Sequence, residues 1–93
     1  MGTTAARKAM QIIKNVEIVL TIELFAACQA IEFQLQYGAP GVGTSAAYNL
    51  VREHVPPIEG DREYRHDIDR CIELVCGGEL VMTVEGAIGS LRV

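Results

Sequence analysis

The feature that most constrains the fold is a run of residues 3–36 that contains neither glycine nor proline. Alanine, leucine, isoleucine, glutamine, lysine and glutamate dominate this run, and these residues favour the α-helix. Gly38 and Pro40 follow it, and they end the pattern because glycine commonly terminates a helix and proline cannot continue one. The sequence therefore predicts one long helix over about residues 3–36.

This helix is too long for the chain that carries it. At 1.5 Å per residue it would span ~50 Å, whereas a compact chain of this size has a radius of gyration of ~12 Å and a diameter of ~32 Å. We therefore expect an inter-chain helix bundle or docking onto a larger body. The alternative is a kinked helix folded back as a hairpin, but no glycine or proline is present to form the kink.

The middle of the predicted helix is apolar on every side. The first turns are amphipathic, but from residue 18 to residue 28 apolar side chains point in all directions, and a helix that is apolar all round is buried all round. Hydrophobic residues make up 49% of the chain and the mean hydropathy is +0.22, which is more apolar surface than a small domain buries easily. This surplus also predicts packing between chains.

Two shorter helices complete a predicted all-α fold. The first is expected over about residues 44–54, with Thr44 or Ser45 as its cap and prolines directly after it. The second is expected to begin with Asp67 as its cap and to end at Gly77 and Gly78. We divide the chain into a helical segment, residues 1–80, and an apolar, glycine-rich tail, residues 81–93. Residues 80–84 could add one more helical turn or an extended strip.

The composition disfavours several classes of partner. The net charge is −4 and the eight basic residues are dispersed, so we expect no binding to nucleic acid. Glu23 lies within the longest apolar stretch, where a central acidic residue costs ~2.5 kcal/mol or more in a bilayer, so we expect no membrane span. The chain shows no secretory signal, and its three cysteines have no framework spacing, which favours a cytoplasmic protein with reduced thiols.

No motif for catalysis, cofactor binding or metal binding is evident. His66, Cys71 and Cys76 could be combined into a zinc set, but Cys71 belongs to an apolar helix stripe and no Cys-x-x-Cys is present. Cys28 has no basic residue within a helical turn to lower its pKa, so a catalytic thiol is not predicted. A small helical regulator or metal binder is the weakest of the hypotheses that the sequence supports.

Glu23 and Gln29 are the polar residues that need an explanation, because they lie in the most apolar stretch. A buried carboxylate is costly unless it is paired or hydrogen-bonded. We interpret both as structural buried polar residues that fix helix register, with a catalytic role as the alternative. The candidate partners are four arginines: Arg52, Arg62, Arg65 and Arg70.

Three segments resemble the C-terminal region of the histidine ammonia-lyase family, the aromatic amino-acid lyases. Residues 18–30 (IVLTIELFAACQA) are similar to the long C-terminal helix of that family. Residues 43–48 (GTSAAY) and 51–56 (VREHVP) resemble its next helix, and residues 61–78 resemble its final helix. The order and spacing agree from about residue 2 to residue 80. One departure is His66, which stands where the family usually has proline before the helix-capping aspartate.

The resemblance implies a mostly helical homotetramer, about five times longer than this chain, whose long helices pack in a central bundle. It also implies a cofactor that this chain cannot form. The family makes an electrophilic methylidene-imidazolone from an internal Ala-Ser-Gly, and this sequence contains no Ala-Ser-Gly. The family's Gln-Glu motif would lie immediately before Met1. No catalytic residue can therefore be assigned here.

Two functional hypotheses follow. In the first, the chain is the C-terminal scaffold and oligomerisation segment of a histidine or aromatic amino-acid ammonia-lyase, as a fragment, a truncated reading frame or half of a split gene, and is inactive alone. Its partners would be further copies, as a dimer or tetramer, or the remainder of a lyase. In the second, it is a stand-alone helical homo-oligomeric module derived from a lyase tail.

Overall fold

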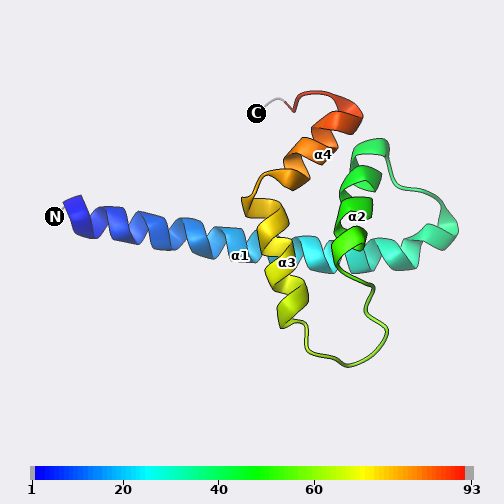
Figure 1. The fold of residues 1–93 in the computed structure, drawn as a ribbon, viewed down its shortest axis with the longest axis horizontal. Coiled ribbons are helices and arrows are strands. Elements are labelled where there is room, and N and C mark those ends of the chain that lie inside the picture. The colour runs from blue at the N-terminus through cyan, green and yellow to red at the C-terminus, as the bar shows by residue number, and fades with distance from the viewer. Residues whose placement is uncertain (1, 92–93) are drawn as a thin grey trace.

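The structure is a computed structural model that describes residues 2–91 of the chain, and within this range it is all helical (Figure 1). The elements are the helices α1 (Gly2–Gln34), α2 (Val42–His54), α3 (Arg65–Cys76) and α4 (Glu79–Ile88), with a short 3-10 helix, η1 (Leu35–Tyr37), directly after α1. No strand occurs in these residues. The predicted all-α class and the predicted long first helix are confirmed.

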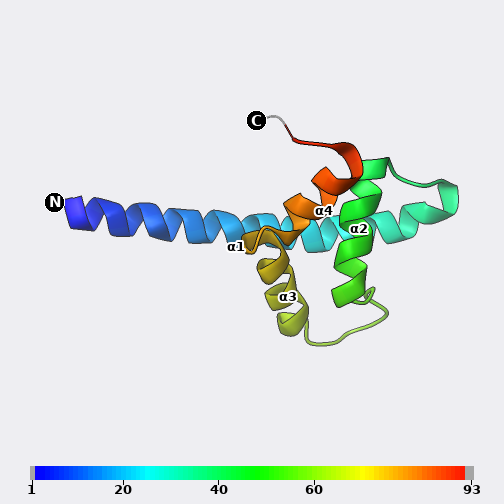
Figure 2. The ribbon, with the colours of Figure 1, turned by 45° about the horizontal axis from the view of Figure 1, so that its top comes forward.

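Helix α1 is a single continuous rod and does not fold back as a hairpin (Figures 1 and 2). Its 33 residues contain no glycine or proline after Gly2, so nothing interrupts the backbone hydrogen bonds. The helix passes into η1 and ends at Gly38, whose φ of 148° is a conformation that favours glycine. The predicted end of the helix is therefore confirmed.

The molecule consists of a bare helical arm and a packed body. We call residues 2–16 of α1 the arm, and residues 17–91 the body. The arm projects away from the other helices in both ribbon views (Figures 1 and 2). The extents are 54 × 37 × 18 Å and the radius of gyration is 15.4 Å, larger than the ~12 Å of a compact chain of this length. The predicted overshoot of the long helix is confirmed.

Helix α2 starts earlier than predicted. It begins at Val42 after Gly41, and the Ser45 amide already donates to the Gly41 carbonyl at 2.8 Å. The expected cap at Thr44 or Ser45 is therefore wrong, and the Ser45 hydroxyl instead donates to the Pro40 carbonyl at 3.1 Å. The end at His54 agrees with the prediction, because Val55 precedes a proline and adopts the extended conformation that this position favours.

Helix α3 also begins before its predicted cap. It starts at Arg65, and the Ile68 amide donates to the Tyr64 carbonyl at 2.9 Å. Asp67 lies inside the first turn and forms an ion pair with Arg62, so its side chain fixes the preceding loop rather than capping the helix. The predicted end is correct: Gly77 and Gly78 follow Cys76, and Gly78 adopts a left-handed conformation with φ of 80°.

A fourth helix occupies the part of the chain that was expected to be a tail. Helix α4 runs from Glu79 to Ile88, longer than the single turn considered for residues 80–84. It packs chiefly on α2 and also on α3. A β-carbon placed on Gly43 of α2 would lie 3.3 Å from the Ile88 side chain. Because glycine has no β-carbon, α2 and α4 can approach each other closely at this point. Residues 92–93 of the predicted tail lie outside the described residues.

The core of the body lies where α1, α2 and α3 meet. Its buried residues are Cys28, Tyr48, Leu50, Val51, Val55, Cys71 and Leu74, with Leu24, Phe25, Ile31 and Leu80 packed against them. Cys71 lies on the apolar stripe predicted for α3 and is completely buried. This small core holds the body-side half of α1 in place and leaves the arm uncovered.

Candidate functional site

Within the body, one side of α1 packs against the other helices. Thr21 and Cys28 are buried on this side, and the Thr21 hydroxyl donates to the Glu17 carbonyl at 2.7 Å. Leu24, Phe25 and Ile31 of the same side pack against the core. Residues of this set recur at intervals of three and four, so they form one continuous stripe. This stripe attaches α1 to α2 and α3.

The other side of α1 is apolar and exposed along the whole helix. The exposed fractions are 62% for Ile12, 49% for Val16, 55% for Val19 and 69% for Phe33. Residues 2–91 therefore cover α1 on one side only. A row of exposed large apolar side chains is typical of an interaction surface.

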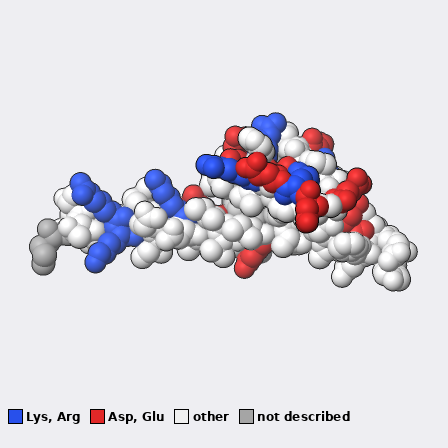
Figure 3. Space-filling model, turned by 90° about the horizontal axis from the view of Figure 1, so that it is seen from below, with Lys and Arg blue, Asp and Glu red and all other residues white. Residues whose placement is uncertain are grey.

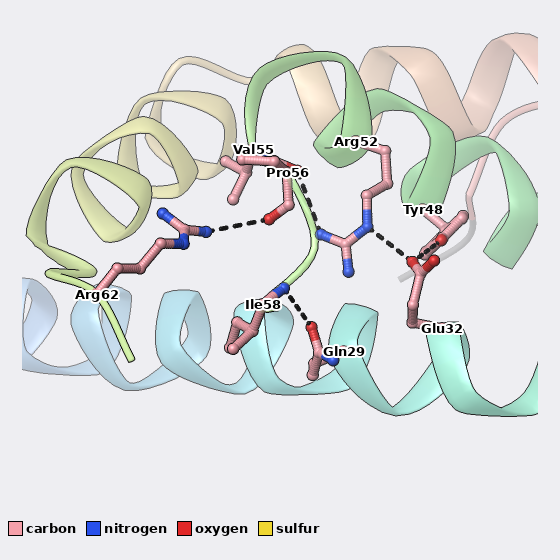
Figure 4. Close-up of polar contacts among 8 residues, drawn as sticks. All are labelled: Gln29, Glu32, Tyr48, Arg52, Val55, Pro56, Ile58 and Arg62. Carbon is pink, nitrogen blue, oxygen red and sulfur yellow. Dashed lines mark hydrogen bonds and ion pairs between the residues drawn. The ribbon is translucent and has the colours of Figure 1, made fainter. Parts of the chain in front are cut away.

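A polar cluster joins α1 to α2 at the end of the body away from the arm (Figure 4). Tyr48 donates its hydroxyl proton to the Glu32 carboxylate, and the Arg52 Nε donates to the same Glu32 oxygen at 3.1 Å. The Arg52 guanidinium also lies over the Tyr48 ring, 5.2 Å from its centroid. Tyr48 and Arg52 are four residues apart on α2, so both reach the same carboxylate.

The cluster changes the proton affinity of its members. The hydrogen bond from Tyr48, together with Arg52, holds the pKa of the Glu32 carboxyl below its ordinary value. Burial and the hydrogen bond to Glu32 raise the pKa of the Tyr48 phenol. These shifts favour a charged Glu32 beside a neutral Tyr48, which is the state that links the helices. Neither side chain is poised to exchange a proton near neutral pH.

Further contacts fix the loop that follows α2 (Figure 4). The Arg52 Nη1 donates to the Val55 carbonyl at 3.2 Å, and the Arg62 Nη2 donates to the Pro56 carbonyl at 3.2 Å. The Ile58 amide donates to the Gln29 Oε1 of α1 at 3.0 Å. Because prolines 56 and 57 have no amide protons of their own, Ile58 supplies the first backbone donor after them. The loop is thereby tied to α1.

Gln29 and Glu23 have different surroundings. Gln29 is half-buried and accepts a hydrogen bond from a backbone amide, rather than from one of the four arginines proposed as partners. Glu23 is exposed on the uncovered side of α1, and among residues 2–91 it forms no ion pair with Arg52, Arg62, Arg65 or Arg70. The interpretation of Glu23 as a structural buried polar residue stays a prediction.

The role of Glu32 as an anchor between α1 and α2 is not predictable from local sequence patterns. Glu32 and Tyr48 are 16 residues apart and Glu32 and Arg52 are 20 apart, so no local spacing links them. Arg52 was named, but as a partner for Glu23 or Gln29. The available signal was Glu32 itself, an acidic residue near the end of an apolar helix that faces an arginine-bearing helix across a short loop.

The cysteines do not form a reactive site. Burial raises the pKa of the Cys28 thiol, and burial raises that of the Cys71 thiol to about 11. Cys76 is exposed and donates to the Glu17 carboxylate at 3.3 Å, a hydrogen bond that raises the pKa of this thiol too. All three thiols are thus kept protonated at neutral pH, which disfavours nucleophilic chemistry. In the described part of the chain, no three His, Cys, Asp or Glu side chains are placed to hold a metal ion.

An apolar hollow of about 390 Å³ lies between α1, α2 and α4. Its polar groups are the Cys28 thiol, the Thr44 hydroxyl and the Tyr48 phenol, and aliphatic side chains such as Leu24, Val84 and Ile88 form the rest of its wall. The Tyr48 hydroxyl is engaged by Glu32. The hollow thus offers a place for apolar atoms but no acid, base or activated nucleophile.

Charge is distributed unevenly along the molecule (Figure 3). The arm carries the basic residues Arg7, Lys8 and Lys14 and no acidic residue. The body-side part of α1 carries the acidic residues Glu17 and Glu23, and then Glu32, with no basic residue. The long helix is therefore positive at one end and negative at the other. No helix among residues 2–91 has both the length and the apolar character needed to cross a membrane.

The comparisons with known proteins point to one family. The family model described as aromatic amino acid lyase matches residues 1–53. The histidine ammonia-lyase of Symbiobacterium thermophilum is 53% identical over 93 residues, and that of Natranaerobius thermophilus is 47% identical over 92 residues. Each alignment covers 99% of this chain but only 18% of the relative. No solved structure gives a significant match.

A third relative shows similar coverage. The histidine ammonia-lyase of Clostridium tetani is 44% identical over 91 residues, which is 95% of this chain and 18% of that protein. The chain therefore spans less than a fifth of the length of the curated relatives that it matches. It corresponds to a segment of these proteins.

Proposed function

The chain belongs to the aromatic amino acid lyase family, and we propose that it is the C-terminal scaffold and oligomerisation segment of a histidine ammonia-lyase or a related lyase. The observation that carries this proposal is the match of 99% of the chain to 18% of a histidine ammonia-lyase. The uncovered apolar side of α1 supports it, because such a surface needs a partner in solution. The parent reaction would break the Cα–N bond of an α-amino acid and a Cβ–H bond, releasing ammonia and an α,β-unsaturated acid.

We further propose that this segment does not catalyse that reaction alone. The residues that would form the family's methylidene-imidazolone are not in the sequence, which has no Ala-Ser-Gly. The polar groups of the body are used between its own helices, as the Glu32 cluster illustrates. The segment would act by holding chains together, in the cytoplasm, with further copies or the remainder of a lyase as partners rather than nucleic acid or a membrane.

The test is to purify the 93-residue chain and measure its activity and its mass. We expect no release of ammonia from histidine, phenylalanine or tyrosine, and a mass by light scattering of at least twice that of one chain. Ammonia release by the pure chain would contradict the proposed inactivity. A single-chain mass at every concentration would contradict the proposed oligomerisation.

A stand-alone homo-oligomeric module is the second candidate, and the same exposed side of α1 favours it. The two candidates differ in whether the chain should restore a truncated lyase. A histidine ammonia-lyase truncated before this segment should regain mass and activity when the chain is added, if the chain is a lyase segment. If the chain oligomerises but never joins the truncated lyase, the stand-alone module is supported instead.

A further inference from the structure

We propose that the outer side of α4 is a docking surface on which the remainder of a lyase packs against this segment. The inference rests on the proposed function, and it adds a contact surface separate from α1 together with the chemistry of the partner. We call this surface the α4 face and define it by its residues, which lie on adjacent turns of one side of the helix: Val81, Met82, Glu85, Gly86 and Ile88.

Helix α4 is apolar on both its inner and its outer side. Its sequence, ELVMTVEGAI, has two glutamates and one threonine as its only polar side chains. The inner side packs on α2 and α3, where Leu80 contacts the core. On the outer side Val81, Met82 and Ile88 are 47%, 73% and 50% exposed, and both ribbon views show α4 at the rim of the body (Figures 1 and 2). A helix that is apolar all round is normally covered all round, so we expect a partner from outside residues 2–91.

Gly86 gives a second reason to expect a close neighbour. It is exposed on α4, and a β-carbon placed on it would meet no atom of the described chain within 4 Å. Its φ is not positive, so nothing within these residues requires glycine, which destabilises a helix relative to alanine. Gly43 differs, because its missing β-carbon makes room for Ile88. By the same logic, Gly86 makes room for a partner whose atoms approach the α4 backbone closely.

The apolar hollow lies beside the α4 face and can hold an anchoring side chain. Ile88 belongs to the α4 face and also lines the hollow, together with Val84. The other walls come from α1 and α2, with side chains such as Leu24 and Ala47. Interfaces between proteins commonly centre on a large side chain that fills such a pocket. The α4 face and the hollow thus form one continuous surface for an apolar partner.

The charges of α4 disfavour a second copy of this chain as the partner. The helix carries Glu79 and Glu85 and no basic residue, and the Leu91 amide donates to the Glu85 carboxylate at 2.9 Å. A two-fold contact would bring the same surface of both copies together, so acidic side chains would meet acidic side chains. Like charges across an interface lower affinity. The expected partner is therefore apolar at its centre and carries lysine or arginine at its edge.

The remainder of a lyase is the occupant that the comparisons favour. The alignment with the histidine ammonia-lyase of Symbiobacterium thermophilum covers 99% of this chain, α4 included, but only 18% of that protein. That protein therefore has the α4 segment together with a much larger body of its own. A large body suits the surface better than a second α4, since ten helical residues span only ~15 Å, whereas a stable interface buries ~800 Å² on each partner.

The experiment uses a chimera in which the S. thermophilum enzyme carries this chain in place of its own aligned segment. Met82→Cys is introduced into the chimera and into the isolated 93-residue chain, both with Cys76→Ser because Cys76 is exposed. Asp69→Cys is the matched control, since Asp69 is exposed on α3 and lies outside the α4 face. Each protein is treated with N-ethylmaleimide, and mass spectrometry of its peptides gives the rate at which the new thiol is alkylated.

We expect the two new thiols to be alkylated at similar rates in the isolated chain, because both positions are exposed there. In the chimera the Met82→Cys thiol should react at least about tenfold more slowly, since thiol reactivity depends on access, while Asp69→Cys reacts as before. Gly86→Leu supplies a second readout of opposite sign. It should raise the thermal midpoint of the isolated chain, because leucine favours the helix more than glycine, and lower that of the chimera by filling the space meant for the partner.

The outcomes separate this inference from the proposed function. If the chimera has the activity and mass of the parent enzyme but Met82→Cys reacts as fast as in the isolated chain, the α4 face is uncovered. The inference is then wrong and the proposed function stands. If Met82→Cys is already protected in the isolated chain and becomes reactive on dilution, the occupant is a second copy and the inference is wrong too. A chimera without the activity and mass of the parent enzyme overturns both.

Discussion

The arm and the body are made of the same helix but are stabilised in different ways. In the body, α1 buries Thr21 and Cys28 and binds the neighbouring loop and helix through Gln29 and Glu32. In the arm, the large side chains Met10, Ile12 and Ile13 are 56%, 62% and 51% exposed. Helix propensity alone sustains the arm, whereas tertiary contacts sustain the body. One half of the helix is therefore held by the rest of its own fold on one side, whereas the other half is uncovered by residues 17–91.

The largest loss of stability should follow when a buried core side chain of the body is truncated. Leu74 is only 4% exposed, and truncation of a buried leucine to alanine costs about 2–5 kcal/mol. We expect Leu74→Ala to lower the free energy of unfolding by this amount, or to abolish the cooperative transition, in urea titrations followed by circular dichroism. Leu20→Ala is the matched control because Leu20 is half exposed. An equal loss in both variants would contradict the core described here.

The sequence predicted the long helix because its causes are local. The absence of glycine and proline from residues 3–36 and the breakers at Gly38 and Pro40 act within one segment, so no tertiary contact is needed to see them. Helix α4 was missed because Gly86 interrupts its pattern and its stability comes from packing on α2, where Gly43 permits the approach of Ile88. The apolar, glycine-rich composition of residues 81–93 is equally compatible with an irregular tail.

The site was less predictable than the fold. Glu32, Tyr48 and Arg52 meet only after α1 and α2 have packed, and no spacing rule joins residues that distant in sequence. The two cap predictions failed because Asp67 and Ser45 use their side chains for the ion pair with Arg62 and the bond to Pro40. Gln29 was interpreted as a structural polar residue with an arginine as its candidate partner, but it accepts a hydrogen bond from the Ile58 amide, which composition could not indicate.

Alkaline pH should destabilise the body through its buried thiol, and we expect no corresponding effect in the arm. Burial raises the pKa of Cys71 from the ordinary value of 9.0 to about 11, so the folded state holds this proton more tightly than the unfolded state. The resulting stability is fully present below pH 9 and is lost as the pH rises from 9 to 11, by about 3 kcal/mol at most. The arm contains neither cysteine nor tyrosine.

The check is a series of urea titrations between pH 8 and pH 11. We expect the midpoint for the wild-type chain to fall across this range, and we expect a smaller fall for Cys71→Ala. The variant should start from a lower stability because the substitution removes a buried side chain. A fall of the same size in both proteins would show that Cys71 is not the titrating group.

A smaller loss should follow from the contact that ties α2 to α1. Tyr48 is 9% exposed and donates to Glu32, and a hydrogen bond to a charged group contributes about 1.5–3 kcal/mol. We expect Tyr48→Phe to destabilise the chain by this amount at neutral pH. The matched control is Tyr37→Phe, because Tyr37 is 85% exposed.

The same substitution should change the acid limb of the stability curve. The Tyr48 hydrogen bond lowers the pKa of Glu32 below 4.5, so its contribution is present above this pH and is lost as the pH falls through the lowered pKa. Between pH 7 and pH 3 the loss of stability should be shallower in Tyr48→Phe than in the wild-type chain or in Tyr37→Phe. If all three proteins lost stability equally between pH 7 and pH 3, the Tyr48 hydrogen bond would not be what lowers the pKa of Glu32.

The smallest effect on folding, and the sharpest test of the contrast, is expected in the arm. Ile12 is 62% exposed, and surface substitutions away from specific contacts usually change stability by less than about 0.5 kcal/mol. Ile12→Ala should therefore leave the urea transition of the dilute, monomeric chain unchanged, since alanine also favours the helix. The proposed association should weaken nevertheless, because Ile12 is one of the large side chains on the uncovered apolar side of α1, and sedimentation over a range of concentrations measures this directly. If Ile12→Ala destabilised the monomer as much as Tyr48→Phe, the arm would have to contact its own body in solution. The contrast between the packed body half of α1 and its uncovered arm would then fail.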